Sequence, residues 1–113
     1  MAEIKVPYEY DGRKFEGMLA YDDSIAAKRP AIFMQPDWLG VCRHSADMAS
    51  EVGGTDYVMM VADMFGAGYG DVERSQEELG KIARGVRADL PFIQGCGAQA
   101  YAALTAEADK RGL

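Results

Sequence analysis

Histidine, cysteine and long apolar runs are all scarce in this sequence of 113 residues. No apolar run approaches the ~20 residues that a helix needs to cross a bilayer, so we expect no membrane contact. The two cysteines, Cys42 and Cys96, are far apart and follow no signal-peptide core, which predicts reduced thiols in a cytoplasmic protein. His44 is the single histidine, so only one imidazole is present for general-base chemistry.

Positive charge is also in short supply. Lys and Arg number 12 against 18 Asp and Glu, a net charge of −6. An acidic surface repels phosphate backbones, so nucleic acid is not an expected partner. Hydrophobic residues at 49% and charged residues at 27% are typical of a globular protein, and the length suits a single domain over residues 1–113.

Three segments have the patterns of strands near the start of the chain. Residues 4–10 alternate apolar and polar side chains, Asp11-Gly12 is a hairpin turn signal, and residues 14–21 form the returning strand. The short apolar run of residues 30–34 is typical of a strand buried on both faces.

The remainder alternates strand and helix. Residues 57–62 predict a second buried strand, and helices are expected over residues 43–52, 72–88 and 98–110. The inward residues expected in the first two helices are Ala46, Met48, Ala49, Val52, Leu79, Ile82 and Val86. Pro91 either interrupts the second helix or starts the third. Together these elements predict an open, three-layer α/β fold of about four strands, with a hairpin, a βαβ unit and C-terminal helices.

Three blocks of this sequence resemble the dienelactone hydrolase family. They are YDGRKFEGMLAY at residues 10–21, PAIFMQPDWLGV at 30–41 and DYVMMVADMFGAGYG at 56–70. The resemblance implies an α/β-hydrolase fold and hydrolysis of a lactone or ester by a Cys-His-Asp triad, with no metal or cofactor. The family's nucleophile lies in a Gly-x-Cys-x-Gly-Gly elbow on the strand after the region where this sequence stops. The resemblance therefore extends to a truncated, N-terminal half of the fold and not to the triad.

The resemblance assigns one part of the family's site to this sequence, the loop after the strand at residues 30–34. Backbone N–H groups that point at the developing oxyanion accelerate acyl transfer, each by roughly 3 kcal/mol. The resemblance assigns one such donor to the N–H of Trp38 and the family's acidic residue to Asp37, with Leu39 beside them in the pocket. Family members usually carry Glu where Asp37 stands and often His or Gln where Pro36 stands. Trp38 could equally pack over the sheet end, and Asp37 could cap the following turn.

Other polar residues have simpler interpretations. Asp63 matches a family Asp that fixes the Gly-rich loop, so we expect a structural role for it. Arg74 or Arg84 could bind a substrate carboxylate, although an exposed helical arginine is the default. His44 is expected in solvent at a helix start, where Cys42 does not face it. The glycines at 66, 68 and 70 lack the flanking residues of a phosphate-binding loop.

Cys96 is the one weak candidate for a nucleophile. Residues 91–100, PFIQGCGAQA, resemble a strand, an elbow and a helix. However, Gln94 stands two positions before the cysteine, where the tight turn needs a small residue, and no histidine follows. A structural, buried cysteine is the favoured interpretation.

In the full fold that the resemblance implies, the strand at residues 30–34 lies next to the nucleophile strand. Without that neighbour it presents free N–H and C=O groups, which can pair with another chain. We therefore expect a homodimer or a complex with a complementary hydrolase half. Three functions remain open: a part of an ester or lactone hydrolase that is inactive alone, a small-molecule-binding or scaffold module that dimerises through the exposed strand, and a minimal thiol hydrolase that uses Cys96. The sequence does not decide whether the chain is an enzyme or which ester or lactone it would bind.

Overall fold

The chain opens with a long hairpin in the computed structural model, which describes residues 1–113. Strands β1 (Ala2–Tyr10) and β2 (Arg13–Tyr21) pair antiparallel, with Tyr10 opposite Arg13. Asp11 and Gly12 both have positive φ, at 53° and 74°. Two positive φ angles are what a two-residue turn requires to match the right-handed twist of the strands. The predicted Asp-Gly hairpin is therefore confirmed.

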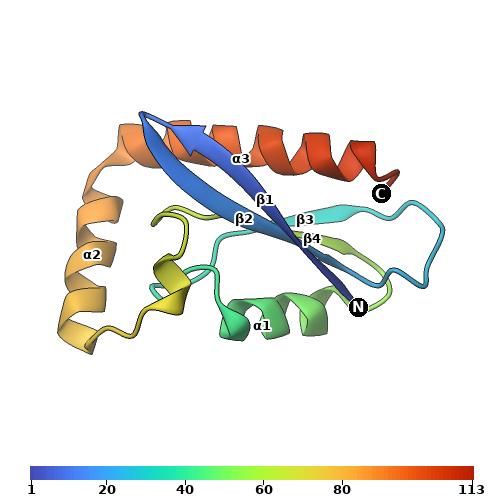
Figure 1. Ribbon diagram of the computed structural model, residues 1–113, viewed down its shortest axis with the longest axis horizontal. Helices are drawn as coiled ribbons and strands as arrows, with labels where there is room; N and C mark the ends of the chain where they lie inside the picture. The colour runs from blue at the N-terminus through green and yellow to red at the C-terminus, as the bar shows by residue number, and fades with distance from the viewer.

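The hairpin forms half of a mixed sheet. Strands β3 (Ala31–Met34) and β4 (Val58–Val61) pair parallel, β2 pairs antiparallel with β4, and the order is β1-β2-β4-β3. The prediction of an α/β fold with about four strands is confirmed. The strand order leaves β3 at one edge of the sheet, as Figure 1 shows.

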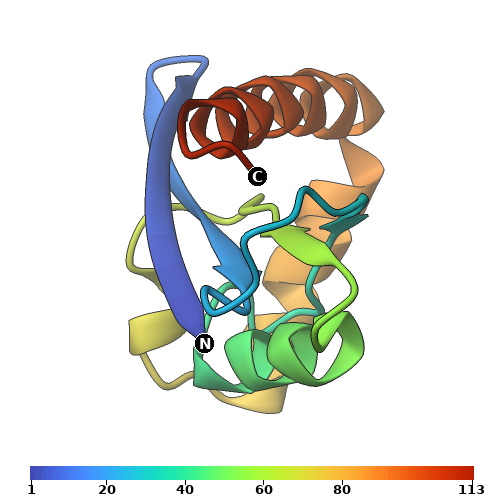
Figure 2. The same ribbon diagram turned by 90° about the vertical axis from the view of Figure 1, so that its right-hand side faces the viewer.

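Helices cover both faces of the sheet, which gives the predicted three layers (Figure 2). Helix α3 (Leu90–Lys110) packs against β1, β2 and β4 and buries a stripe of residues spaced four apart: Cys96, Ala100, Leu104 and Ala108. Helix α1 (Arg43–Gly53) lies on the other face and buries Ala46 and Ala49. None of the helices has the length and apolar character needed to cross a bilayer.

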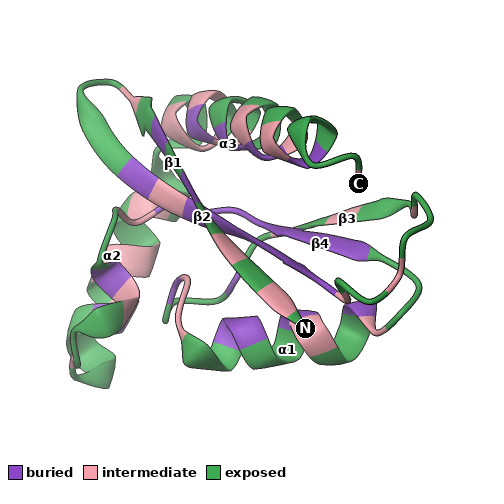
Figure 3. Cartoon of the chain, turned by 45° about the vertical axis from the view of Figure 1, so that its right-hand side comes forward, coloured by how far each residue is buried: buried purple, intermediate pink, exposed green.

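Two expectations about burial are wrong, each for its own reason. Strand β3 is only partly buried, and Phe33 is 39% exposed, because no further strand or helix covers that edge (Figure 3). On α1, Met48 and Val52 are exposed at 42% and 56%, while Ser45 and Gly53 are buried with the two alanines. The buried stripe of α1 is therefore rotated from the predicted one, and its small residues allow close approach to the sheet.

The helix boundaries in the second half also differ from the prediction. Helix α2 (Gln76–Ala88) begins four residues later than expected, because Ser75 caps it by accepting a hydrogen bond from the N–H of Glu78. A short 3-10 helix, η1 (Tyr69–Asp71), precedes it. Pro91 starts α3 rather than interrupting α2, so α3 includes residues 90–97, which were predicted outside it. Leu79 is buried as predicted, whereas Ile82 and Val86 are only partly buried.

Asp63, which follows β4, fastens the Gly-rich loop to the sheet. The residue is 2% exposed, and its carboxylate accepts hydrogen bonds from the N–H groups of Phe65 and Gly66, at 2.9 and 3.0 Å, and of Glu16, at 2.9 Å. The Tyr8 hydroxyl donates to the Asp63 carbonyl at 2.5 Å and accepts from its N–H at 2.8 Å. Burial raises the pKa of Tyr8 well above its ordinary value, so the phenol stays protonated as this donor. The predicted structural role of Asp63 is confirmed.

Replacing Asp63 by Ala should destabilise the fold by about 3 kcal/mol or more, because three N–H groups lose a charged acceptor. Asp109→Ala, which removes an exposed carboxylate from α3, should change stability by less than about 0.5 kcal/mol. Urea denaturation followed by circular dichroism measures both. Equal midpoints for the two variants would contradict the role assigned to Asp63.

Candidate functional site

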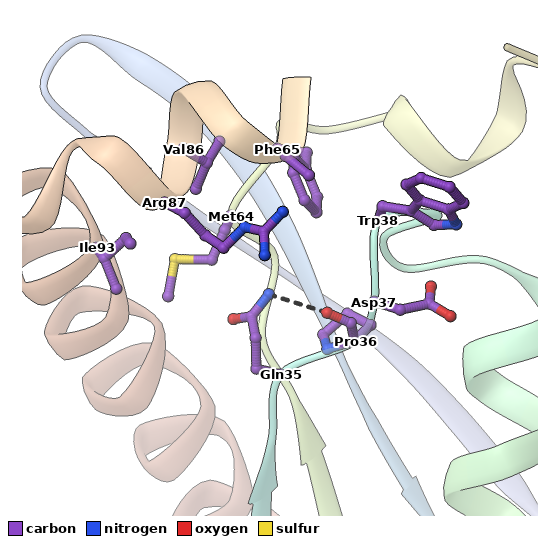
Figure 4. A pocket seen from close by; sticks show the side chains of 10 residues that line it. Gln35, Pro36, Asp37, Trp38, Met64, Phe65, Val86, Arg87 and Ile93 are labelled. Atoms are coloured by element: carbon purple, nitrogen blue, oxygen red, sulfur yellow. Dashed lines mark hydrogen bonds between the residues drawn. The ribbon is translucent and has the colours of Figure 1, made fainter. Parts of the chain in front are cut away.

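A cavity of about 400 Å³ lies where the loop after β3 and the loop after β4 meet α2 and α3. Its walls are mostly apolar, and its polar groups come from the β3 loop and from Arg87 (Figure 4). The lining residues are Gln35, Pro36, Asp37, Trp38, Met64, Phe65, Ala83, Val86, Arg87 and Ile93. An apolar hollow with a few convergent polar groups is the usual form of a small-molecule site.

The loop after β3 is a tight turn held by its own hydrogen bonds. The Asp37 carboxylate accepts from the N–H of Leu39 at 3.0 Å, and the Asp37 carbonyl accepts from the N–H of Gly40 at 3.0 Å. Gly40 has φ of 70°, and a Cβ there would lie 2.7 Å from a ring carbon of Tyr69, so only glycine fits the turn. The turn-capping alternative for Asp37 is thus realised in the structure.

Tyr69 of η1 fixes the position of this turn. Its hydroxyl donates to the Trp38 carbonyl at 2.7 Å, and its ring stacks on Phe65 with centroids 4.5 Å apart. Burial raises the pKa of Tyr69 above its ordinary value, so this donor stays protonated. The β3 loop and the β4 loop are therefore locked together at the cavity.

These contacts leave one donor of the turn unused. The N–H groups of Leu39 and Gly40 are bonded within the turn, whereas the N–H of Trp38 has no acceptor in the protein. Trp38 lines the cavity and is 38% exposed, so the residue belongs to the site wall rather than to the core. A fixed N–H beside an apolar cavity can donate to the oxygen of a bound carbonyl compound.

The three residues predicted to form the pocket are only partly brought together. Asp37 and Trp38 line the cavity, but Leu39 lies against a separate hollow beside Arg74. Figure 4 shows the Asp37 carboxylate directed away from the Arg87 guanidinium. No group of three or more His, Cys, Asp or Glu side chains is placed to hold a metal ion.

The arginine at the cavity is not one of those named from the sequence. Arg74 donates to the carbonyls of Tyr69 and Val72, at 2.6 and 3.2 Å, and Arg84 is exposed on α2 outside the cavity wall. Arg87, which sequence reasoning missed, lines the cavity instead. Its spacing of four residues from Ala83 was the available signal, because residues three and four apart share a helix face.

The remaining lining residues were also missed as site residues. Met64 and Phe65 follow β4 in the Gly-rich loop, Gln35 directly follows β3, and Ile93 belongs to the first turns of α3. Only the convergence of the strand ends with two helices brings them together. Sequence spacing alone gives no sign of that convergence.

Cys96 does not have the exposure or the surroundings of a nucleophile. It is fully buried within α3, and its thiol donates to the Asp63 carbonyl at 3.6 Å. Burial, together with the nearby Asp63 carboxylate, raises the pKa of the thiol to about 11. The flanking glycines serve packing, because a Cβ on Gly95 would lie 2.0 Å from the Tyr10 hydroxyl. The favoured interpretation of Cys96 as a structural residue agrees with this placement.

The other thiol and the histidine form no dyad. Cys42 is the N-cap residue of α1, and its N–H donates to the Ser45 hydroxyl at 2.8 Å. His44 is exposed two residues further on. Neither residue lines the cavity, so no imidazole stands beside the Trp38 N–H.

Comparisons with known proteins identify the fold. No family model matches the sequence, and no curated protein matches it. Among solved structures, one named m3DLH is similar with a TM-score of 0.77 at 23% identity, over 93% of this chain and 43% of that one. A dienelactone hydrolase-like promiscuous phosphotriesterase, P91, from metagenomic libraries is similar with a TM-score of 0.71 at 22% identity, over the same shares of the two chains.

The present chain thus spans less than half the length of these structures. Its mixed sheet, with β3 at the edge, corresponds to a part of a larger sheet-and-helix protein. The chain therefore has the fold of part of a dienelactone hydrolase-like α/β-hydrolase.

Proposed function

We propose that this chain carries the acyl-binding loop of an ester or lactone hydrolase and does not hydrolyse these substrates by itself. The observation that supports this proposal is the unused N–H of Trp38 in a locked turn beside an apolar cavity. That N–H would hold the oxygen of a substrate carbonyl, and the cavity would hold its acyl or ring portion. The likeness to dienelactone hydrolase-like structures supports this assignment of the loop.

The proposed reaction needs a nucleophile and a base from outside the residues seen here. Cys96 is buried and protonated, and the only histidine, His44, does not line the cavity. One oxyanion donor stabilises the transition state by roughly 3 kcal/mol, which is too little for turnover without a nucleophile. The open side of β3 is where a further strand that carries such a nucleophile would pair.

A second candidate function is a stand-alone binding module. The cavity supports it, because residues of this chain line a mostly apolar hollow of about 400 Å³. This function needs binding of a small apolar molecule but no preference for an oxyanion. The two candidates therefore differ in whether the Trp38 N–H contributes to binding.

Removing the Trp38 N–H should weaken binding of a tetrahedral oxyanion mimic. A short alkyl phosphonate monoester carries negative oxygens where the reacting carbonyl would stand. Its affinity for Trp38→Pro, which lacks the N–H, should be at least about tenfold lower than for Trp38→Phe, because a hydrogen bond to a charged group contributes ~1.5–3 kcal/mol. Isothermal titration calorimetry measures both affinities, and circular dichroism checks the fold.

The matched neutral alkyl ester gives the control for that comparison. Its affinity should change less between the two variants, since it carries no formal charge for the N–H to stabilise. Equal phosphonate affinities for Trp38→Pro and Trp38→Phe would show that the Trp38 N–H is not an oxyanion donor. The binding module would then be the better explanation of the cavity.

The Cys96 thiol should react slowly in the folded protein. At about pH 8 a thiol with a pKa near 11 is almost wholly protonated, and burial also blocks access to Cys96. In the Cys42→Ser variant, the native protein should react with a disulfide reagent much more slowly than the same protein in denaturant. Raising the pH toward 11 should speed the native reaction, because the thiolate fraction rises. Fast stoichiometric labelling of the native variant at about pH 8 would restore Cys96 as a candidate nucleophile.

A further inference from the structure

Tyr69 and Arg74 lie outside the cavity wall but are joined to the turn that carries the Trp38 N–H. The Tyr69 hydroxyl donates to the Trp38 carbonyl at 2.7 Å. The N–H of the same peptide group, on Leu39, donates to the Asp37 carboxylate at 3.0 Å. The Arg74 guanidinium carbon lies 4.0 Å from the centroid of the Tyr69 ring. A chain of contacts therefore runs from the Arg74 cation, through one peptide group, to the Asp37 anion.

We propose that Tyr69 and Arg74 are positioning residues that set how strongly the Trp38 N–H binds an oxyanion. Neither residue touches the ligand. Tyr69 acts through the Trp38 carbonyl, and Arg74 acts through Tyr69. The inference rests on the proposed function and deepens it, because it names the side chains outside the cavity that hold the same donor in place.

The direction of the Trp38 N–H depends on the peptide groups on both sides of the residue. A peptide bond is planar and trans, so this N–H points opposite to the Asp37 carbonyl. That carbonyl accepts from the Gly40 N–H at 3.0 Å within the turn, so the Trp38 N–H is directed out of the turn. The Tyr69 hydroxyl holds the peptide on the other side of Trp38. A donor that is already oriented binds a charged oxygen more strongly than one that must be ordered on binding.

Tyr69 is held firmly enough to act as this anchor. The residue is 8% exposed, and its ring stacks on Phe65 of the loop that follows β4. A Cβ on Gly70 would overlap the Val41 carbonyl, so η1 packs directly on the chain that leaves the turn. Arg74 completes the arrangement, because one of its nitrogens donates to the Tyr69 carbonyl at 2.6 Å while the guanidinium lies against the ring.

The Arg74 cation also strengthens the hydrogen bond that Tyr69 donates. A positive charge beside a phenol ring favours loss of the proton, which makes the O–H a better donor. Burial raises the pKa of Tyr69 above its ordinary value, and the Arg74 charge opposes this effect without overcoming it. The phenol therefore stays protonated and donates as a polarised group. Hydrogen bonds in a chain polarise one another, so the bond from Leu39 to the Asp37 carboxylate is strengthened as well.

Tyr69→Phe tests the first step, since it removes the hydroxyl and keeps the aromatic ring. Its affinity for the alkyl phosphonate should be about fivefold lower than that of the unaltered protein, the net effect of one hydrogen bond. Affinity for the matched neutral ester should stay within about twofold. Tyr101→Phe, which removes an exposed hydroxyl from α3, should change neither affinity. Trp38 is the only tryptophan, so its fluorescence follows each titration.

A double-mutant cycle tests the step from Arg74 to Tyr69. Arg74→Met removes the charge and should lower phosphonate affinity about threefold, the size of an exposed cation–π contact. In the Tyr69→Phe background the same change should have little further effect, because no hydroxyl remains for Arg74 to act through. Arg74→Lys keeps the charge and should retain most of the affinity. Equal losses from Arg74→Met in both backgrounds would overturn the action of Arg74 through Tyr69.

A readout without ligand separates positioning from a general loss of structure. In Tyr69→Phe the Leu39 amide proton should move upfield in NMR spectra and exchange faster with solvent, because the hydroxyl no longer polarises and holds its peptide group. Amide protons of β2 and β4 should keep their shifts. Widespread shift changes, together with equal losses of phosphonate and ester affinity, would overturn the proposal in favour of a purely structural role.

The outcomes also separate this inference from the proposed function. Equal affinity of the unaltered protein for the phosphonate and the ester would contradict both. A loss of phosphonate affinity in Trp38→Pro relative to Trp38→Phe, without a loss in Tyr69→Phe, would contradict this inference alone. Losses in both Trp38→Pro and Tyr69→Phe, confined to the phosphonate, are the result that we expect.

Discussion

The buried carboxylate of Asp63 ties together the segments on which the site depends. It takes hydrogen bonds from β2 and from the Gly-rich loop, while its backbone groups bind Tyr8 of β1 and the Cys96 thiol of α3. A buried charge is tolerated only when such donors surround it. Asp63 fixes the loop that carries Phe65, Phe65 stacks on Tyr69, and the Tyr69 hydroxyl donates to the Trp38 carbonyl. The position of Trp38 therefore depends on Asp63.

The strands could be predicted from the sequence because their signals are local. Asp11-Gly12 and the apolar runs around β3 and β4 depend on turn chemistry and alternation, and each strand appeared where expected. Asp63 was likewise assigned correctly, through the resemblance of its segment. The burial of β3 was not, since a strand's apolar content does not show whether a neighbour exists to cover it.

The site was harder to predict because it forms only where separate elements converge. Trp38 and Asp37 were found through a local resemblance, but Leu39 lies in another hollow and Arg87 was overlooked. The Gly-Cys-Gly sequence around Cys96 resembles a catalytic elbow, yet its glycines allow Tyr10 and Met64 to approach α3. A close helix–strand contact and a tight turn both favour glycine, so composition alone does not separate them.

The open edge of β3 bears directly on the proposed function. A further strand that carries a nucleophile would pair at that edge, whereas the cavity and the Trp38 donor belong to the residues described here. The chain on its own would then bind acyl compounds and not turn them over.

A burst assay with a p-nitrophenyl ester, on protein of known oligomeric state and with or without thiol alkylation, tests this account most directly. The account predicts no burst of p-nitrophenol and no hydrolysis above the buffer rate, with alkylation making no difference. A burst that approaches one equivalent per chain and disappears on alkylation would contradict it. That result would show that Cys96 or Cys42 is a working nucleophile and that this fold is an enzyme by itself.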